Sequence, residues 1–151
     1  EHHKQPYSRS GFLNLRSISI HADELIKKFQ VKTPSQETHA KNLSGGNIQK
    51  VVLAREISRN PRVILAAQPT RGLDIGATEY VREQLLEQRA KGAAVMLISE
   101  DLDEIFALSD RIAVMYEGQI MDIVPRQDAT PERLGLLMAG VRPEEGAPVP
   151  T

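Results

Sequence analysis

Two short apolar runs, RVILAA at residues 62–67 and AAVMLI at residues 93–98, place the strongest limit on how this chain can fold. Neither run has the polar alternation of a half-exposed strand, so each is predicted to be a strand buried on both faces. Such strands form parallel sheets, in which a helix crosses between neighbouring strands. The segment 76–91 suits that helix, with Asp74 as its cap and Gly92 as its stop. The sequence therefore predicts an α/β fold with a mostly parallel sheet.

Helical spacing of apolar residues occurs in two segments before the first predicted strand. From about residue 17 to residue 30, apolar side chains recur three and four positions apart, which predicts an amphipathic helix. A loop containing Pro34 follows this segment. A second helix is expected over residues 47–59, and Asn60-Pro61 ends it.

The sequence after the second strand predicts a helix, a hairpin and a last short helix. Asp101 and Glu104 have the spacing of a capping box. The two apolar runs that flank Glu117-Gly118 have the spacing of hairpin strands joined by a two-residue turn. Thr130-Pro131 is typical of a helix start.

Composition excludes several classes of function. Nineteen Lys and Arg against twenty Asp and Glu give no basic field for nucleic acid. The absence of cysteine removes disulfides, thiolate metal sites and cysteine nucleophiles. No apolar run approaches the roughly 20 residues of a membrane span, so a role at a membrane requires another chain as anchor. No metal site is predicted, because His2-His3 has too few ligands and first-turn carboxylates at 100–104 suit a helix dipole.

The segment LSGGNIQK at residues 43–50 carries the clearest chemical signal. Ser44 is expected to accept hydrogen bonds from the amides of the following helix. Gly45 and Gly46 keep side chains away and expose N–H groups at the positive end of the helix dipole, which makes a seat for an anion. The alternative is an ordinary glycine-containing N-cap after a loop.

From about Gly11 to Gly140, the chain resembles the nucleotide-binding domain of ABC transporters. LSGGNIQKVVLAREISRNPRVIL is similar to the ABC signature helix leading into the Walker B strand, and PTRGLD is similar to the approach to the D-loop. AAQPTRGLDIGA and the stretch 97–105 resemble the second cassette of the tandem ATP-binding subunits of sugar and nucleoside importers. Chromosome-maintenance and repair proteins also carry LSGG, but this chain lacks their long heptad repeats.

The resemblance implies a partial P-loop NTPase fold of the ABC type, with a helical subdomain and a C-terminal hairpin and helix. On this interpretation residues 1–60 belong to the helical subdomain with the signature helix. Residues 61–140 form part of the ATPase core, and residues 141–151 form a flexible tail. The chain is expected to begin within the helical subdomain, just after the Gln-loop.

Three positions depart from what the resemblance implies for catalysis. Ala67 and Gln68 stand where the family has a magnesium-holding Asp and a water-polarising Glu, and Glu100 stands at the switch His. Alanine cannot ligate, glutamine is no base, and a carboxylate repels a γ-phosphate. No intact catalytic residue is therefore expected. The 151 residues also contain no GxxxxGK[ST] loop, so the chain alone is expected to bind neither ATP nor Mg²⁺.

The signature core itself is unaltered, and the resemblance implies that it acts on ATP held by another domain. Ser44, Gly45 and Gly46 would meet the γ-phosphate of that ATP, and Gln49 would lie near its ribose or phosphates. Asp74 would face the partner at the D-loop, or simply cap its own helix.

The first hypothesis is therefore the energy-coupling subunit of an ABC importer for sugars or nucleosides, using ATP and Mg²⁺ in the complete assembly. Its partners would be a second nucleotide-binding domain, transmembrane permeases and, indirectly, a periplasmic or lipoprotein substrate-binding protein. It would lie peripherally at the cytoplasmic face of the membrane. A non-transport regulatory or scaffold domain and a soluble translation or repair ATPase are the alternatives. Bare sheet edges and apolar surface also predict self-association.

Overall fold

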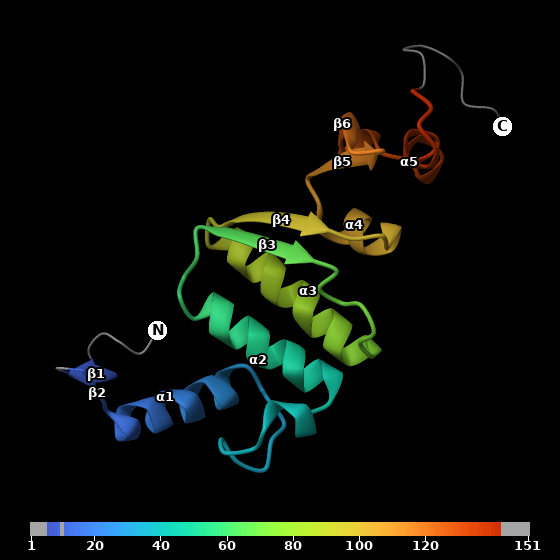
Figure 1. Cartoon of the computed structure of the whole chain (residues 1–151). Coiled ribbons are helices and arrows are strands. Elements are labelled where there is room, and N and C mark those ends of the chain that lie inside the picture. The colour runs from blue at the N-terminus through green and yellow to red at the C-terminus, as the bar shows by residue number, and fades with distance from the viewer. Residues whose placement is uncertain (1–5, 10, 143–151) are drawn as a thin grey trace. The chain divides into compact units, whose positions relative to one another are not determined.

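The structure is a computed structural model that describes residues 6–9 and 11–142. These residues fall into two compact units that divide between Met96 and Leu97 (Figure 1). Both units contain helices and strands, so the chain is α/β as predicted. The predicted domain boundary near residue 60 stays a prediction, and the predicted tail lies, except for Val141 and Arg142, outside the described residues.

The first unit contains three α-helices, three complete strands and the first part of a fourth strand. Its elements are β1 (Ser8–Arg9), β2 (Phe12–Leu13), α1 (Leu15–Lys28), a 3₁₀ turn (Ala40–Asn42), α2 (Gly45–Ile57), β3 (Val63–Ala67), α3 (Ile75–Ala90) and β4 (Ala94–Ile98), which spans the division. Helix α1 begins two residues earlier than expected, because Asn14 Oδ1 accepts a hydrogen bond from the Ser17 amide at 3.1 Å. Helix α2 also begins earlier than expected, since both signature glycines lie in its first turn.

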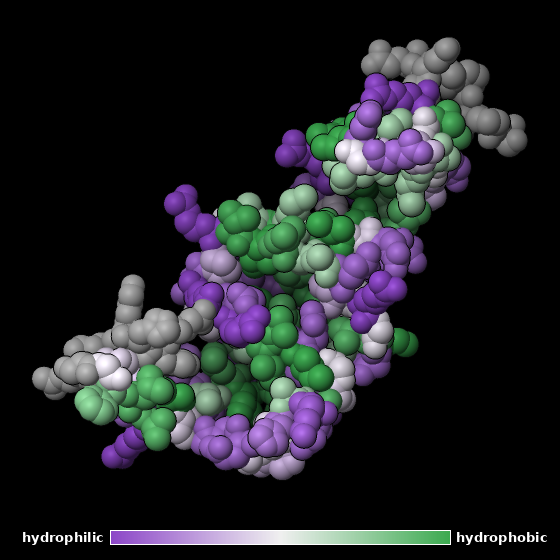
Figure 2. Space-filling model, in the orientation of Figure 1, coloured by the Kyte–Doolittle hydropathy of each residue, from purple (hydrophilic) through white to green (hydrophobic). Residues whose placement is uncertain are grey.

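Strands β3 and β4 form a two-stranded sheet, and their arrows point the same way in Figure 1. The connection through α3 is the predicted parallel crossover. The prediction that both strands are buried on both faces is wrong, because side chains alternate between covered and exposed along each strand. Val63 is 69% exposed and Met96 60% exposed, and Figure 2 shows this apolar face as a green patch over β3 and β4.

The core of the first unit is aliphatic apart from one phenylalanine. Its buried apolar side chains come from α2, α3, β3 and the turn after α1, and they include Phe29, Val31, Leu53, Ile57, Val81 and Leu85. Phe29 is 1% exposed at the end of α1, where the chain turns toward the signature helix. The segment after α1 and the second half of α2 are therefore both part of this core.

The second unit packs two helices around a hairpin. Its elements are α4 (Leu102–Leu108), β5 (Arg111–Tyr116), β6 (Gln119–Pro125), a 3₁₀ turn (Arg126–Asp128) and α5 (Pro131–Met138). Glu117 and Gly118 have φ values of 46° and 78°, which is the two-residue hairpin turn that the sequence predicted. Thr130 Oγ1 accepts from the Arg133 amide at 3.2 Å and so caps α5 as expected. The buried core consists of Ile105, Ile112, Val114, Val124, Ala129, Leu134 and Leu137.

Replacing Gly140 with alanine should destabilise the second unit. Gly140 has a φ of 80°, and a Cβ there would lie 2.6 Å from the Tyr116 ring. The variant is strained at its backbone and displaces the ring, so its free energy of unfolding should fall by about 2 kcal/mol. Urea unfolding followed by circular dichroism measures this change.

Gly135→Ala is the matched control for that variant. Gly135 lies inside α5, and a Cβ there would meet nothing within 4 Å. Alanine is favoured over glycine inside a helix by about 1 kcal/mol, so the control should be slightly more stable than the parent chain. An equal loss of stability in both variants would contradict the structure around Gly140.

Candidate functional site

The sequence predicted an anion-binding site at the N-terminus of α2. Ser44 is the N-cap, with extended backbone, and its carbonyl accepts the first helical hydrogen bond, from the Ile48 amide at 2.9 Å. The prediction that the Ser44 side chain accepts from helix amides is wrong, because its hydroxyl caps no amide. It accepts instead from Asn47 Nδ2 at 3.0 Å.

A chain of two hydrogen bonds holds the Ser44 hydroxyl. The Lys32 amide donates to Asn47 Oδ1 at 2.7 Å, and the other end of the same carboxamide donates to Ser44 Oγ. No role for Asn47 was predicted from the sequence. The signal for one was an asparagine in the first turn of a helix, where its side chain competes for local backbone partners.

The first-turn amides of α2 remain available to a ligand. Within the part of the chain that the structure describes, the backbone N–H groups of Gly45, Gly46 and Asn47 donate to no acceptor. Ser44 and Gly45 are exposed and Gly46 and Asn47 are half-buried, so this end of α2 reaches solvent. Unpaired N–H groups at the positive end of a helix dipole favour negative charge. The N-terminal turn of α2 at residues 44–47, the mouth of α2, therefore has the chemistry of an anion-binding site.

The two signature glycines pack against the start of α3, and Figure 1 shows both helices beginning at the same end of the first unit. A Cβ on Gly46 would lie 2.9 Å from the Ala77 Cβ and 3.9 Å from Asp74 Oδ2. A Cβ on Gly45 would come no closer than 4.0 Å to Leu73 Cδ2. Gly46 is therefore required for close helix packing, whereas Gly45 keeps the mouth itself open.

Asp74 is the cap of α3, as the sequence predicted. Its Oδ1 accepts from the Ala77 amide at 2.8 Å, and the residue is exposed. Its second oxygen lies 3.9 Å from the place that a Cβ on Gly46 would take. The structure thus brings the predicted D-loop position and the signature mouth together within one unit.

Gln49 and Lys50 occupy the second turn of α2. Gln49 lies one helical turn beyond Gly45 and is half-buried, so it shares the face of the mouth. Lys50 serves the fold: its Nζ donates to the Gln30 carbonyl at 3.3 Å and lies 4.5 Å from the Tyr80 ring centroid. Burial, then the carboxylates of Glu87 and Glu83, raise the pKa of the Tyr80 phenol, so this ring stays neutral beside Lys50.

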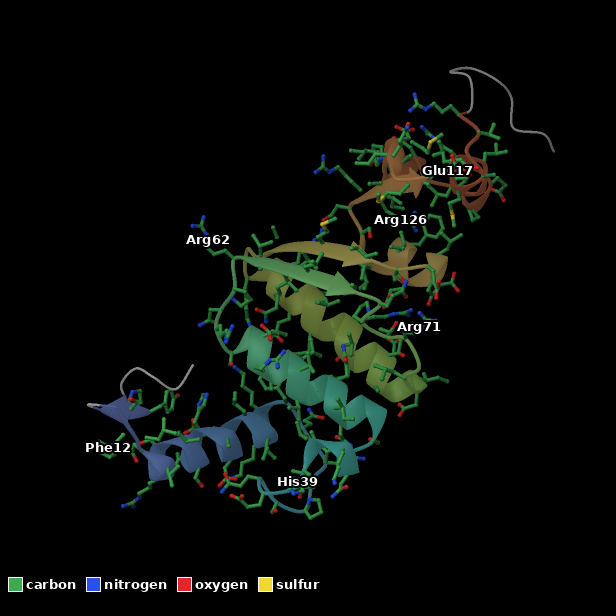
Figure 3. The ribbon with its side chains drawn as sticks, viewed as in Figure 1. Phe12, His39, Arg62, Arg71, Glu117 and Arg126 are labelled. Carbon is green, nitrogen blue, oxygen red and sulfur yellow. The ribbon has the colours of Figure 1, made fainter. Side chains whose placement is uncertain are left out.

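The predicted Walker B positions lie where β3 ends. Ala67 is the exposed last residue of β3, and Gln68 follows it with a φ of 48°. That left-handed conformation is costly for a residue with a Cβ, so this turn holds a strained backbone. Arg71 projects from the loop between β3 and α3, and it is exposed (Figure 3).

Glu100, the predicted switch position, is exposed at the start of the second unit. The following Asp101 caps α4 by accepting from the Asp103 amide at 2.9 Å and the Glu104 amide at 3.3 Å. Across residues 6–9 and 11–142, no group of three His, Cys, Asp or Glu side chains has the arrangement of a metal site. In the same residues no helix has the length and hydropathy of a membrane span.

Curated proteins that are similar to this chain in sequence are import ATP-binding proteins. The chain is 51% identical over 144 residues to the guanosine import ATP-binding protein NupO of Bacillus subtilis, covering 95% of this chain and 28% of the relative. It is 48% identical to the nucleoside import ATP-binding protein NupA of Lactococcus lactis, covering 92% of this chain and 28% of the relative. The ribose import ATP-binding protein RbsA of Bacillus licheniformis is 42% identical, with 90% and 28% covered. No protein-family model matches the sequence.

Solved structures agree on the fold. The dimeric structure of the ATP-binding cassette MJ0796 bound to ADP and Pi matches with a TM-score of 0.65 and 25% identity, over 80% of this chain and 52% of that one. MJ1267, an ATP-binding cassette of an ABC transporter, matches with a TM-score of 0.64 at 21% identity, which supports the fold alone.

The chain therefore has part of the P-loop NTPase fold of ABC ATPase cassettes, which confirms the predicted fold class. Its homologues are sugar and nucleoside import ATP-binding proteins, and its structural neighbours are ABC ATPase cassettes. It spans 28% of the length of these relatives and about half of the solved cassettes.

Proposed function

We propose that this chain is part of the energy-coupling subunit of an ABC importer for sugars or nucleosides. Its α2 mouth would bind the γ-phosphate of an ATP that another cassette domain holds. The observation that carries the proposal is the open mouth of α2, with an exposed Ser44 hydroxyl and unpaired first-turn amides. The names of the relatives support the ATP-dependent import of sugars or nucleosides.

The mechanism would use this mouth as a fixed set of hydrogen-bond donors. Closure of the two domains would bring the γ-phosphate against Ser44, Gly45 and Gly46, and these groups would stabilise the negative charge as water attacks phosphorus and ADP leaves. Gln49, one turn further along α2, would lie beside the ribose or phosphates. Asp74 would cap α3 and also face the partner domain.

The other nucleotide site, to which this chain would contribute Ala67, Gln68 and Glu100, is proposed to be catalytically impaired. None of the three side chains can do what a Walker B carboxylate, a water-polarising glutamate or a switch histidine does. The pair of domains would then have one competent and one impaired site. Mg²⁺ would accompany ATP at both, held by groups outside this chain.

The proposed partners follow from this arrangement. They are the second cassette domain, the transmembrane permeases and, through the permeases, a periplasmic or lipoprotein substrate-binding protein. The subunit would lie at the cytoplasmic face of the membrane. The dimeric form of the solved MJ0796 cassette supports the pairing of two such domains.

ATP binding tests the proposal that this chain acts on ATP held elsewhere. Titration calorimetry of the 151-residue chain with ATP and Mg²⁺ should give no binding, because its sequence has no phosphate-cradling loop or P-loop lysine. The complete subunit that contains this chain should bind ATP under the same conditions. Micromolar binding by the chain alone would contradict the proposal.

A further inference from the structure

We propose that Asn47 is a positioning residue that fixes the Ser44 hydroxyl as a hydrogen-bond donor toward the phosphate. This inference rests on the proposed function of the α2 mouth. It assigns a task to a side chain whose hydrogen bonds go to the Lys32 amide and the Ser44 hydroxyl, so that it would act through Ser44.

The orientation of the Asn47 carboxamide follows from its backbone partner. The Lys32 N–H can only donate, so the atom 2.7 Å from it must be the carboxamide oxygen. The NH₂ group therefore faces Ser44, and at 3.0 Å it donates to the hydroxyl oxygen. A flipped amide would place two donors against each other at the Lys32 end.

The direction of the Ser44 hydroxyl proton follows in turn. A serine hydroxyl has one proton and two lone pairs, and Asn47 Nδ2 occupies one of the lone pairs. The proton cannot point at Asn47, and the hydroxyl accepts from no helix amide. It is therefore available to a ligand that lies beside the unpaired amides of Gly45 and Gly46. All of these groups are then donors, which suits an anion.

The anchor of this arrangement is the segment between α1 and the 3₁₀ turn. Lys32 follows Val31, which is buried, and Phe29 just before it is also buried. The Gln30 carbonyl between them accepts from Lys50 Nζ at 3.3 Å. Asn47 is therefore held in place by a segment that packs into the core. The Ser44 hydroxyl is then already oriented before ATP binds.

A double-mutant cycle on the complete importer tests this role. We expect Asn47→Ala to lower kcat/KM for ATP hydrolysis about tenfold when Ser44 is present. In a Ser44→Ala background, the same substitution should change kcat/KM by less than about twofold, because the hydroxyl that it positions is gone. Loss of the same factor in both backgrounds would mean that Asn47 acts on the fold alone, and would overturn the inference.

Two further variants keep the test decisive. Asn47→Asp keeps an acceptor for the Lys32 amide and loses the donor to Ser44, so it should keep the thermal unfolding midpoint and still lose activity. Wild-type kcat/KM in Asn47→Asp would overturn the inference even where Asn47→Ala fails to fold. Asn42→Ala is the matched control. Asn42 is an exposed asparagine just before the signature, and its side chain makes no hydrogen bond to the described residues, so activity should be unchanged. If Ser44→Ala alone has no effect on hydrolysis, the proposed function itself fails, which is a different outcome from additivity.

Discussion

Replacing Ser44 with arginine in the complete importer should reduce ATP hydrolysis at least about 100-fold. The arginine side chain would fill the mouth of α2 and keep the γ-phosphate away from the amides of Gly45 and Gly46. Folding should be little affected, because Ser44 is exposed and its hydroxyl caps no amide. Hydrolysis is measured as phosphate release by the reconstituted transporter, and circular dichroism checks the fold.

Gln68→Ala is the control for this prediction at the other nucleotide site. The proposal already makes that site catalytically impaired, so loss of the glutamine should change turnover by less than about twofold. Wild-type turnover in Ser44→Arg would refute a role of this mouth in hydrolysis. A large loss in Gln68→Ala would refute the impaired site while leaving the signature role intact.

Local sequence signals predicted most of the elements, because each signal acts within a few residues. Asp74, Thr130 and the Glu117-Gly118 turn were all placed correctly, since caps and two-residue turns depend on the side chain and backbone of adjacent positions. The apolar runs at 62–67 and 93–98 were likewise correctly assigned to strands. Their burial was not, because an apolar run does not say which element covers each face.

The state of the Ser44 hydroxyl could not be predicted from local signals. A serine before two glycines is typical of a side-chain cap, and the expectation followed that rule. The observed partner depends on Asn47, which in turn depends on the Lys32 amide, 15 residues earlier in the chain. Contacts of that range are set by the packing of α1 and α2. The roles of Ala67, Gln68 and Glu100 are carried by the family resemblance and stay predictions.

The close packing of α2 on α3 predicts a large loss of stability in one variant and a partial recovery when a second substitution is added. Gly46→Ala would place a Cβ 2.9 Å from the Ala77 Cβ, and neither atom can rotate away from its backbone. The two helices must separate, so the free energy of unfolding should fall by about 1–3 kcal/mol. Ala77→Gly removes the opposing methyl group, so the double variant Gly46→Ala, Ala77→Gly should be more stable than the sum of the two single changes by about 1–2 kcal/mol.

Gly45→Ala tests the access of phosphate to the mouth of α2 without changing how α2 packs on α3. A Cβ at Gly45 would meet its nearest neighbour, Leu73 Cδ2, at an ordinary 4.0 Å, so this variant should unfold like the parent chain. Its methyl group would nevertheless stand among the exposed amides that the phosphate is proposed to meet, and hydrolysis should fall by about tenfold or more. Gly46→Ala should lose stability and activity together, and adding Ala77→Gly should recover part of both, because the position of the mouth depends on how closely α2 packs on α3. If the double variant is no more stable than the additive expectation, the helices do not meet at Gly46 and Ala77.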